Sequence, residues 1–298
     1  MRVFITGASG FIGRAVVTEL LKAGHQVVGL ARSEKAASVI SWLGAGIQRG
    51  DLDDLDSIRV GVKNADAVIH LANKHDWANP AESNRAERAA VQTISDTLAG
   101  TDRPFLLASG LAGFNLDRPV TEHDPNPAVG PNSPRGGAEN LALEYAERGV
   151  HVVVVRFAPT VHGAEDHGFV SLIAQNSRRH GAVRYPGDGA NRWAAVHRFD
   201  AAQLVRLGLE NAQPGTILHA VAEESVPIRT IAEVLAERLD LPTQSTPAEQ
   251  LVAELGFVGY ALSGDWAATS HITRDLLNWQ PTGPTLLEDI AAGHYDQP

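Results

Sequence analysis

The segment at residues 6–13, Thr-Gly-Ala-Ser-Gly-Phe-Ile-Gly, constrains the fold of this chain more than any other. It follows an apolar run at residues 3–5 and leads into a helical pattern of apolar residues, the order of a strand, a glycine turn and a helix. Such a turn brings unpaired backbone N–H groups at a helix N-terminus close to an anion. We therefore expect this turn to bind a dinucleotide through Gly7, Ser9, Gly10, Phe11, Ile12 and Gly13.

The overall composition narrows the class of protein. The chain has 298 residues, a formal net charge of −10 and no cysteine. The negative charge argues against a nucleic-acid or anionic-membrane partner, and the missing cysteines exclude disulfides and thiolate metal ligands. The first residues read as a buried strand and not as a signal peptide, and no apolar stretch approaches the ~18 residues of a membrane helix. We expect a soluble cytoplasmic protein whose substrate is a small molecule.

The residues after the second expected strand, at 25–31, indicate the form of the cofactor. An NAD site usually places an acidic residue about 20 positions beyond the glycines, where it binds the ribose 2′-hydroxyl. This chain has Arg32 and Ser33 there, which suit a 2′-phosphate. NADP(H) is therefore favoured over NAD(H), with a solvated loop charge as the alternative role for Arg32.

Two further strand ends are expected to face the cofactor. Asp51 and Leu52 follow the short strand at 46–49, where a carboxylate would lie beside the adenine amine and an apolar side chain against its ring. A helix N-cap is an equally good interpretation of Asp51. The apolar strand at 67–72 should end beside the middle of the cofactor, with Leu71, Ala72 and Asn73 in contact.

The alternation of strands and helices predicts an α/β fold, a Rossmann doubly wound parallel sheet with helices on both faces. Helices are expected at 34–43, 80–99 and 135–148, with strands at 105–109 and 151–156 around a glycine- and proline-rich loop at 110–133. We expect the dinucleotide domain to span 1–160, with returning segments near 195–222. Residues 161–298 should form a smaller region that covers the substrate.

These motifs, with His70-Leu71-Ala72, Ser109 after the fifth strand and the segments at 192–200 and 279–282, resemble the extended short-chain dehydrogenases/reductases. That superfamily includes the NAD-dependent epimerases and dehydratases. The resemblance covers nearly the whole chain and implies a Rossmann domain, a C-terminal substrate region and a nicotinamide cofactor between them. It also raises a homodimer, through helices at 80–99 and 135–148, as an open alternative to a monomer.

The chain departs from that superfamily at the catalytic pair, a tyrosine followed four residues later by a lysine. The resemblance puts Arg135 at the tyrosine position and Glu139 at the lysine position, and no Tyr-x-x-x-Lys occurs in the sequence. Ser109 or Gly110 falls in the family's serine position. The chain therefore resembles an atypical member that keeps cofactor binding. A plain surface ion pair is an equally good interpretation of Arg135 and Glu139.

A carbonyl reduction still needs a proton donor, and two histidines are candidates. His75 follows the fourth strand, and His162 occupies a position where family members commonly have a tyrosine near the nicotinamide. The run His162, Glu165, Asp166 and His167 also invites a metal site, but no further histidine has the i, i+4 spacing, so we expect no metal.

The leading hypothesis is an NADP(H)-dependent oxidoreductase that reduces a small or medium carbonyl- or imine-type compound. Ser109 would polarise the substrate, His162 or His75 would handle the proton, and Arg135 and Glu139 would shape the site. The alternatives are a non-catalytic NADP(H)-binding sensor or regulator and, third, a nucleotide-sugar epimerase or dehydratase.

Overall fold

The computed structural model, which describes residues 1–74, 76, 79–114 and 116–296, is built around a seven-stranded sheet in which all neighbouring strands run parallel. Across the sheet the strands are β10 (Thr216–Ala220), β6 (His151–Phe157), β5 (Pro104–Gly110), β4 (Ala67–His70), β1 (Arg2–Thr6), β2 (Gln26–Ala31) and β3 (Gly46–Arg49). The expected Rossmann-type α/β fold is confirmed.

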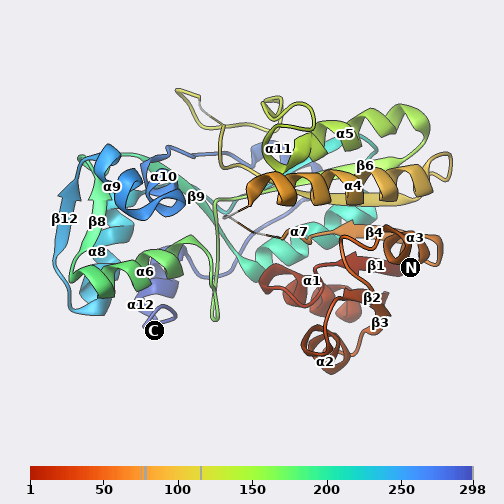
Figure 1. Ribbon diagram of the computed structural model, residues 1–298, viewed down its shortest axis with the longest axis horizontal. Helices are drawn as coiled ribbons and strands as arrows, with labels where there is room; N and C mark the ends of the chain where they lie inside the picture. The colour runs from red at the N-terminus through yellow and green to blue at the C-terminus, as the bar shows by residue number, and fades with distance from the viewer. Residues whose placement is uncertain (75, 77–78, 115, 297–298) are drawn as a thin grey trace.

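Helices cover both faces of this sheet (Figure 1). One face carries α1 (Phe11–Lys22), α2 (Glu34–Trp42), α7 (Arg198–Asn211) and α11 (His271–Leu277). The other face carries α3 (Leu55–Lys63), α4 (Pro80–Leu98) and α5 (Ala138–Glu144), with the short turns η1 (Pro134–Gly137) and η2 (Tyr145–Arg148) at the two ends of α5. Because both faces are covered, strands such as β4 and β6 are apolar on both sides.

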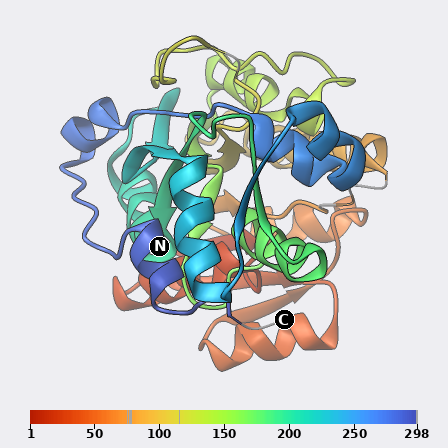
Figure 2. The ribbon, with the colours of Figure 1, turned by 90° about the vertical axis from the view of Figure 1, so that its left-hand side faces the viewer.

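A second, smaller region lies beside the main sheet, at the left of Figure 1 and toward the viewer in Figure 2. Its strands are β7 (Thr160–His162), β9 (Arg192–His197) and β11 (Glu223–Pro227) in one sheet and β8 (Val183–Pro186) with β12 (Thr243–Thr246) in another. Its helices are α6 (Phe169–His180), α8 (Ile228–Leu239), α9 (Ala248–Leu255), α10 (Phe257–Ser263) and α12 (Leu286–Ala291). The core of this region includes the stacked rings of Trp193 and Trp266, whose centroids are 5.9 Å apart.

The chain crosses between the two regions more than once. After β9, helix α7 packs on α1 and strand β10 joins the edge of the main sheet beside β6. Helix α11 then packs against β10 and α7. The C-terminal region therefore holds its position through elements that belong to both cores.

The expected helix at 135–148 is wrong in its first turn. Arg135, Gly136 and Gly137 have φ angles of 55°, 62° and 62°, so the chain makes a left-handed turn and right-handed helix begins only at Ala138. The physical reason is steric. A Cβ at Gly136 would lie 2.5 Å from the carbonyl oxygen of Asn84, so the turn fits against α4 only with glycine there.

Within the part of the chain that the structure describes, every helix is too short or too polar to cross a lipid bilayer.

Candidate functional site

The glycine turn between β1 and α1 has the geometry expected of a phosphate-binding turn. Gly7 has a φ of 75°, and the N–H of Gly10 donates to the Gly7 carbonyl at 3.0 Å. A Cβ at Gly7 would lie 2.8 Å from the backbone nitrogen of Ala72, and a Cβ at Gly13 would lie 2.0 Å from the Gly7 oxygen. The turn is therefore pressed against both the end of β4 and its own helix, and only glycine fits at these two positions.

The N-terminus of α1 is suited to a pyrophosphate. Its N-cap is Gly10, which offers no side-chain hydrogen bond to the first N–H groups of the helix, while Ser9, Phe11 and Ile12 remain partly exposed. Arg198 adds positive charge nearby, since its guanidinium carbon lies 5.2 Å from the centre of the Phe11 ring. The uncapped helix end and the space that the glycines leave fit the cofactor that the turn predicts.

The residues expected at the adenosine end lie at the ends of β2 and β3. Arg32 is exposed, and among the described residues its side chain has no ion pair or hydrogen bond. Ser33 is the N-cap of α2, accepting a hydrogen bond from the Ala36 N–H at 3.2 Å, a role that the sequence analysis missed. Arg32 is therefore free to meet a phosphate, and the Ser33 hydroxyl keeps its proton to donate.

Asp51 and Leu52 are placed differently from each other. Asp51 accepts a hydrogen bond from the Asp53 N–H at 3.0 Å, and the N-cap of α3 is Asp54, so the alternative role of Asp51 as this N-cap is wrong. The Leu52 side chain belongs to the core under α3, which leaves only 9% of the residue exposed. Asp51 thus remains half-buried at the end of β3, where a ligand can reach it.

The end of β4 links the glycine turn to a buried carboxylate. Leu71 and Ala72 donate their N–H groups to the oxygens of Thr6, at 3.2 and 3.3 Å. Asn73 donates its amide to Glu87 of α4 at 3.0 Å. All three residues after β4 are half-buried, so they lie where the sequence analysis expected the cofactor's middle.

Glu87 is 1% exposed, and its partner is Arg135. The Arg135 guanidinium donates to Glu87 at 2.6 Å, and its backbone N–H donates to the Asn84 side chain at 2.8 Å. His70 lies close by, with Nε2 3.9 Å from the Glu87 carboxylate. Burial lowers the pKa of His70, with Glu87 opposing, so the ring is neutral near pH 7. Arg135 is thus held by a buried acid of α4 and not by Glu139.

Glu139 forms a second buried network, with Ser109. The Ser109 hydroxyl donates to Glu139 Oε2 at 2.5 Å, and the Asn126 amide donates to the same oxygen at 2.7 Å. Arg156 donates to Oε1 through Nε at 3.0 Å and through Nη2 at 2.6 Å. All but Asn126 are buried, with Arg156 fully enclosed. The structure therefore brings Ser109 and Glu139 together at the carboxyl ends of β5 and β6, and the surface-pair alternative is wrong for Glu139.

His162 lies in the C-terminal region, at the end of β7. The ring is fully buried, and its Nδ1 hydrogen donates to Asp289 of α12 at 2.5 Å. Its Nε2 has no hydrogen-bond partner among the described residues and lies 3.7 Å from Glu223. His75, the other histidine predicted to carry a proton, lies outside the described residues.

Two more histidines lie near the Asp289 carboxylate that His162 binds. His294 lies 3.2 Å and His197 3.9 Å from its carboxylate. Burial opposes the ionisation of Asp289, but the hydrogen bond and charge of His162 prevail and lower its pKa. Burial also lowers the pKa of His197. No group of three or more His, Asp or Glu side chains suited to a metal ion occurs among the described residues.

The loop after β7 reaches the N-terminus of α1. Glu165 forms an ion pair with Arg14 at 2.8 Å, and the His167 ring packs edge-on against Phe11 with centroids 5.9 Å apart. Arg198 donates to the Ala164 carbonyl at 2.7 Å. Two of the four residues that invited a metal interpretation, Glu165 and His167, therefore join the loop to the glycine-turn helix.

Three residues of these networks were missed from the sequence, namely Glu87, Asn126 and Arg156. The sequence does indicate that Arg156 is buried, since this residue directly follows the apolar run Val152–Val155 of a strand buried on both sides. A buried arginine requires a buried acid, which Glu139 supplies. Glu87 gave a similar signal as a charge between Ala86 and Ala90 on the apolar side of α4.

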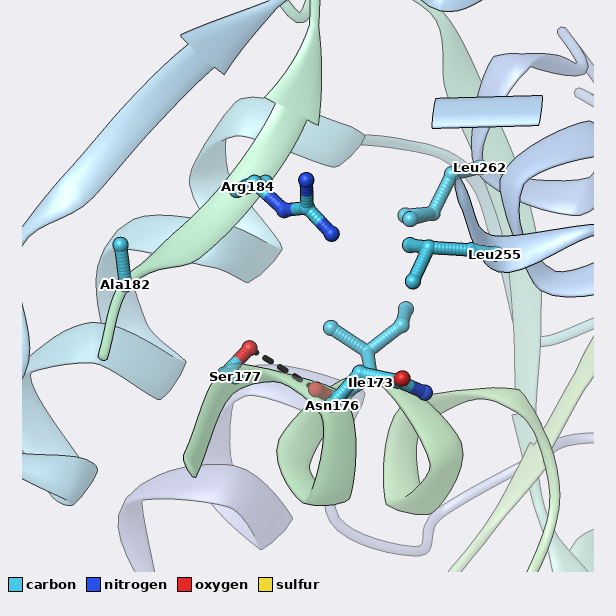
Figure 3. A pocket seen from close by; sticks show the side chains of 7 residues that line it. All are labelled: Ile173, Asn176, Ser177, Ala182, Arg184, Leu255 and Leu262. Carbon is cyan, nitrogen blue, oxygen red and sulfur yellow. Dashed lines mark hydrogen bonds between the residues drawn. The ribbon is translucent and has the colours of Figure 1, made fainter. Parts of the chain in front are cut away.

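A cavity of about 10 Å³ lies far from the glycine turn, between α6, β8, α9 and α10 (Figure 3). Arg184 points into it, between Ile173 and Leu255, and binds Glu254 through Nη1. The cavity is the size of one water molecule. It is too small for an organic substrate.

The sequence matches a known protein family over most of its length. The sequence profile described as the NAD dependent epimerase/dehydratase family matches residues 3–220. An uncharacterized protein of Schizosaccharomyces pombe is 41% identical over 296 residues, 99% of this chain and 100% of that protein. One from Saccharomyces cerevisiae is 40% identical over 298 residues, 99% of each chain. The 2-alkyl-3-oxoalkanoate reductase of Stenotrophomonas maltophilia is 26% identical over 81% of this chain and 77% of its own.

Solved structures share the fold. MoeE5 in complex with UDP-glucose and NAD superposes with a TM-score of 0.74 at 24% identity, over 99% of this chain and 97% of that chain. UDP-glucose 4-epimerase of Thermotoga maritima gives a TM-score of 0.76 at 18% identity, over 99% and 98%. At these identities the likeness shows a shared arrangement of helices and strands and nothing beyond the fold.

Proposed function

The chain belongs to the NAD-dependent epimerase/dehydratase family, and from this premise we propose that it is an NADP(H)-dependent oxidoreductase of atypical type. Its substrate is a small or medium organic compound with a carbonyl or imine group. The observation that carries the proposal is the Ser109–Glu139 hydrogen bond of 2.5 Å at the carboxyl end of β5. It puts a hydroxyl and a carboxylate together at the sheet edge that holds the glycine turn, where ligands of such folds bind.

The cofactor half supports this proposal through its fit to a nicotinamide dinucleotide. The glycine turn and the uncapped end of α1 would hold the pyrophosphate, and the residues after β4 would border its middle. Bound there, such a cofactor supplies or accepts a hydride. Arg32, exposed and free of partners among the described residues, supports NADP(H) over NAD(H) because a guanidinium binds a 2′-phosphate through two parallel hydrogen bonds.

The residues around Arg135 and Ser109 support a reaction that does not use a tyrosine. An arginine at position 135 keeps its proton at any physiological pH, so it acts through charge and hydrogen bonds alone. Glu87 holds the Arg135 guanidinium at 2.6 Å, while 34% of the side chain stays exposed to meet a substrate oxygen. The second network supplies the Ser109 hydroxyl, which Glu139 orients.

Among relatives whose names state an activity, three are reductases and one is a dehydrogenase, the sterol-4-alpha-carboxylate 3-dehydrogenase of Dictyostelium discoideum. Besides the 2-alkyl-3-oxoalkanoate reductase, they include the 2'-dehydrokanamycin reductase of Streptomyces kanamyceticus, 29% identical over 86% of this chain and 72% of its own. These proteins act on compounds of different size, so they support the reaction class and leave the substrate open.

The test measures cofactor binding and cofactor consumption separately. The purified protein is titrated with NADPH and NADH by fluorescence, and NADPH oxidation is then followed with 4-nitrobenzaldehyde, ethyl 3-oxobutanoate and 1-pyrroline as aldehyde, ketone and imine probes. Tight NADPH binding with turnover of one probe class supports the proposal. Binding without consumption of any probe points instead to a sensor, and failure to bind either dinucleotide overturns both.

A further inference from the structure

We propose that Glu139 is the proton-storing group of this site and exchanges its proton with the substrate through the Ser109 hydroxyl. This inference rests on the proposed function and assigns the proton transfer to named atoms. It also makes Arg156 and Asn126 positioning residues, which hold Glu139 without touching the substrate.

The geometry of the Ser109–Glu139 pair supports direct proton exchange. The 2.5 Å separation of Ser109 Oγ and Glu139 Oε2 is at the short end of the range for an O–H donor on a carboxylate. Ser109 is the last residue before the strand end at Gly110, and both groups are buried, with Ser109 5% and Glu139 4% exposed. We route the proton through the serine because its hydroxyl lies at the carboxyl end of β5, where ligands of such folds bind.

The carboxylate itself is immobilised on its other side. Arg156 binds Oε1 with two donors, at 3.0 and 2.6 Å, and this arginine is in turn fixed by the Asp124 carbonyl at 2.8 Å. Asn126 binds Oε2 at 2.7 Å, beside the serine. With its lone pairs occupied in this way, Glu139 has one route for receiving or releasing a proton, which is the hydrogen bond to Ser109.

In the reducing direction the carbonyl carbon accepts a hydride, with both electrons of the broken C–H bond, from NADPH. The carbonyl oxygen takes the Ser109 proton, and Ser109 Oγ takes the proton of the Glu139 carboxyl group. After the product leaves, the remaining carboxylate is reprotonated by solvent through the Ser109 hydroxyl, the same route in reverse. In the oxidising direction, with NADP⁺ as the hydride acceptor, the ionised Glu139 receives the proton, so this is the direction for which the ion pair with Arg156 is ready.

The charged groups around Glu139 determine how the pH profile responds to mutation. Arg156 of β6 faces it directly, and His219 of β10 lies behind Arg156, with Nε2 3.4 Å from Nη1. Burial lowers the pKa of His219 to about 4, so this ring is neutral near pH 7. Two acids of the 110–133 loop have partners of their own, since Asp124 binds Arg118 and Glu122 binds Thr273. Arg156 therefore supplies the positive charge that directly faces the Glu139 carboxyl group.

The matched variants are Arg156→Gln, which loses this charge, and Arg156→Lys, which keeps it. The rate of reduction should fall as pH rises in the wild type. We expect Arg156→Gln to move that profile by about one pH unit toward higher pH, because losing a nearby positive charge favours the protonated carboxyl. Arg156→Lys should leave it in place. Asn126→Ala keeps the ion pair and should give a smaller shift of the same sign, which covers the case in which Arg156→Gln does not fold.

Three measurements decide the proposal. Using 4-nitrobenzaldehyde or ethyl 3-oxobutanoate, Ser109→Ala should reduce kcat/KM by about 10²–10³-fold with unchanged NADPH affinity, and Ser109→Thr should restore much of it. Infrared titration of the free protein should show a carboxyl band that Glu139→Gln removes. Uniformly slower variants with an unshifted profile, or no such band, would mean that the network is structural and overturn the relay alone.

The remaining outcomes also separate the two proposals. Reduction of 1-pyrroline with neither carbonyl probe consumed overturns the relay but keeps the oxidoreductase function, because an iminium ion needs no proton from the protein. Failure of all probes overturns the function and, with it, the relay.

Discussion

Asp289 of α12 and His162 of β7 form a buried hydrogen bond of 2.5 Å between residues 127 positions apart. This bond fastens the C-terminal helix to the loop that reaches the glycine-turn helix, because Gly163 and its neighbours follow His162 directly. A histidine whose Nδ1 is fixed in this way first serves the packing of the C-terminal region.

The first prediction therefore concerns His162. We expect His162→Gln to lower the free energy of unfolding by about 1–3 kcal/mol, because it disturbs a buried donor to a buried carboxylate. The pH profile of turnover should not move. Chemical denaturation and steady-state kinetics of the same preparation check both statements. Loss of turnover without loss of stability would instead give His162 the proton-handling role predicted from the sequence.

The second prediction concerns pH and His219. Its pKa falls from the ordinary 6.5 to about 4 on burial, so between these values the unfolded chain binds a proton that the folded chain does not. Stability is complete above pH 6.5 and is lost as pH falls toward 4, by up to roughly 3 kcal/mol. In His219→Asn, which keeps a donor for the Thr269 carbonyl, this part of the pH dependence should vanish. Denaturant midpoints measured across this range test it.

The third prediction concerns the left-handed turn. Gly136→Ala forces a Cβ to within 2.5 Å of the Asn84 oxygen, whereas Gly181→Ala, at a φ of 74°, meets nothing within 4 Å. Both variants should lower the free energy of unfolding by about 1 kcal/mol, because alanine is less stable than glycine in the left-handed backbone region. Gly136→Ala should lower the free energy of unfolding by about 1–3 kcal/mol more, because the turn must move away from α4. Equal unfolding free energies for the two variants would contradict the close fit.

The fourth prediction concerns cofactor choice. Arg32→Ala should raise the Kd for NADPH about 10–100-fold, the value of a charge-assisted bond to phosphate, and should change the Kd for NADH little. Arg49→Ala is the matched control, since this neighbouring arginine is already paired with Glu34 at 2.7 Å. If Arg32→Ala weakens both dinucleotides equally, Arg32 is a general surface charge and NADP(H) is not preferred.

The sequence predicted well what depends on local pattern. The order of β1, the glycine turn and α1 follows from residues within one short segment, and the parallel sheet follows from strands that are apolar on both faces. Ser109 and Glu139 were both found as candidates, but their contact was not, because it depends on where α5 lies against β5. The partner of Arg135 also escaped prediction, since Glu87 is 48 positions away on another helix.

The helix predicted at 135–148 was wrong in its first turn for a related reason. The pattern of Arg135 and Glu139 fits a helical i, i+4 pair, and two successive glycines leave the handedness of the backbone undetermined. The contacts of Gly136 with α4 and of Gly137 with Gly130 decide it. Tertiary packing that local sequence does not encode therefore set the arrangement of the site.

This left-handed turn also limits which side chains positions 135 and 139 can bring together. A tyrosine placed at 135 and a lysine placed at 139 would not pair on one face of a right-handed helix, because right-handed helix begins only at Ala138. The new lysine would stand against the buried charge of Arg156, and the new tyrosine would leave Glu87 without its arginine. A tyrosine-and-lysine pair at these positions would therefore require the backbone at 135–137 and the buried charges around it to change together.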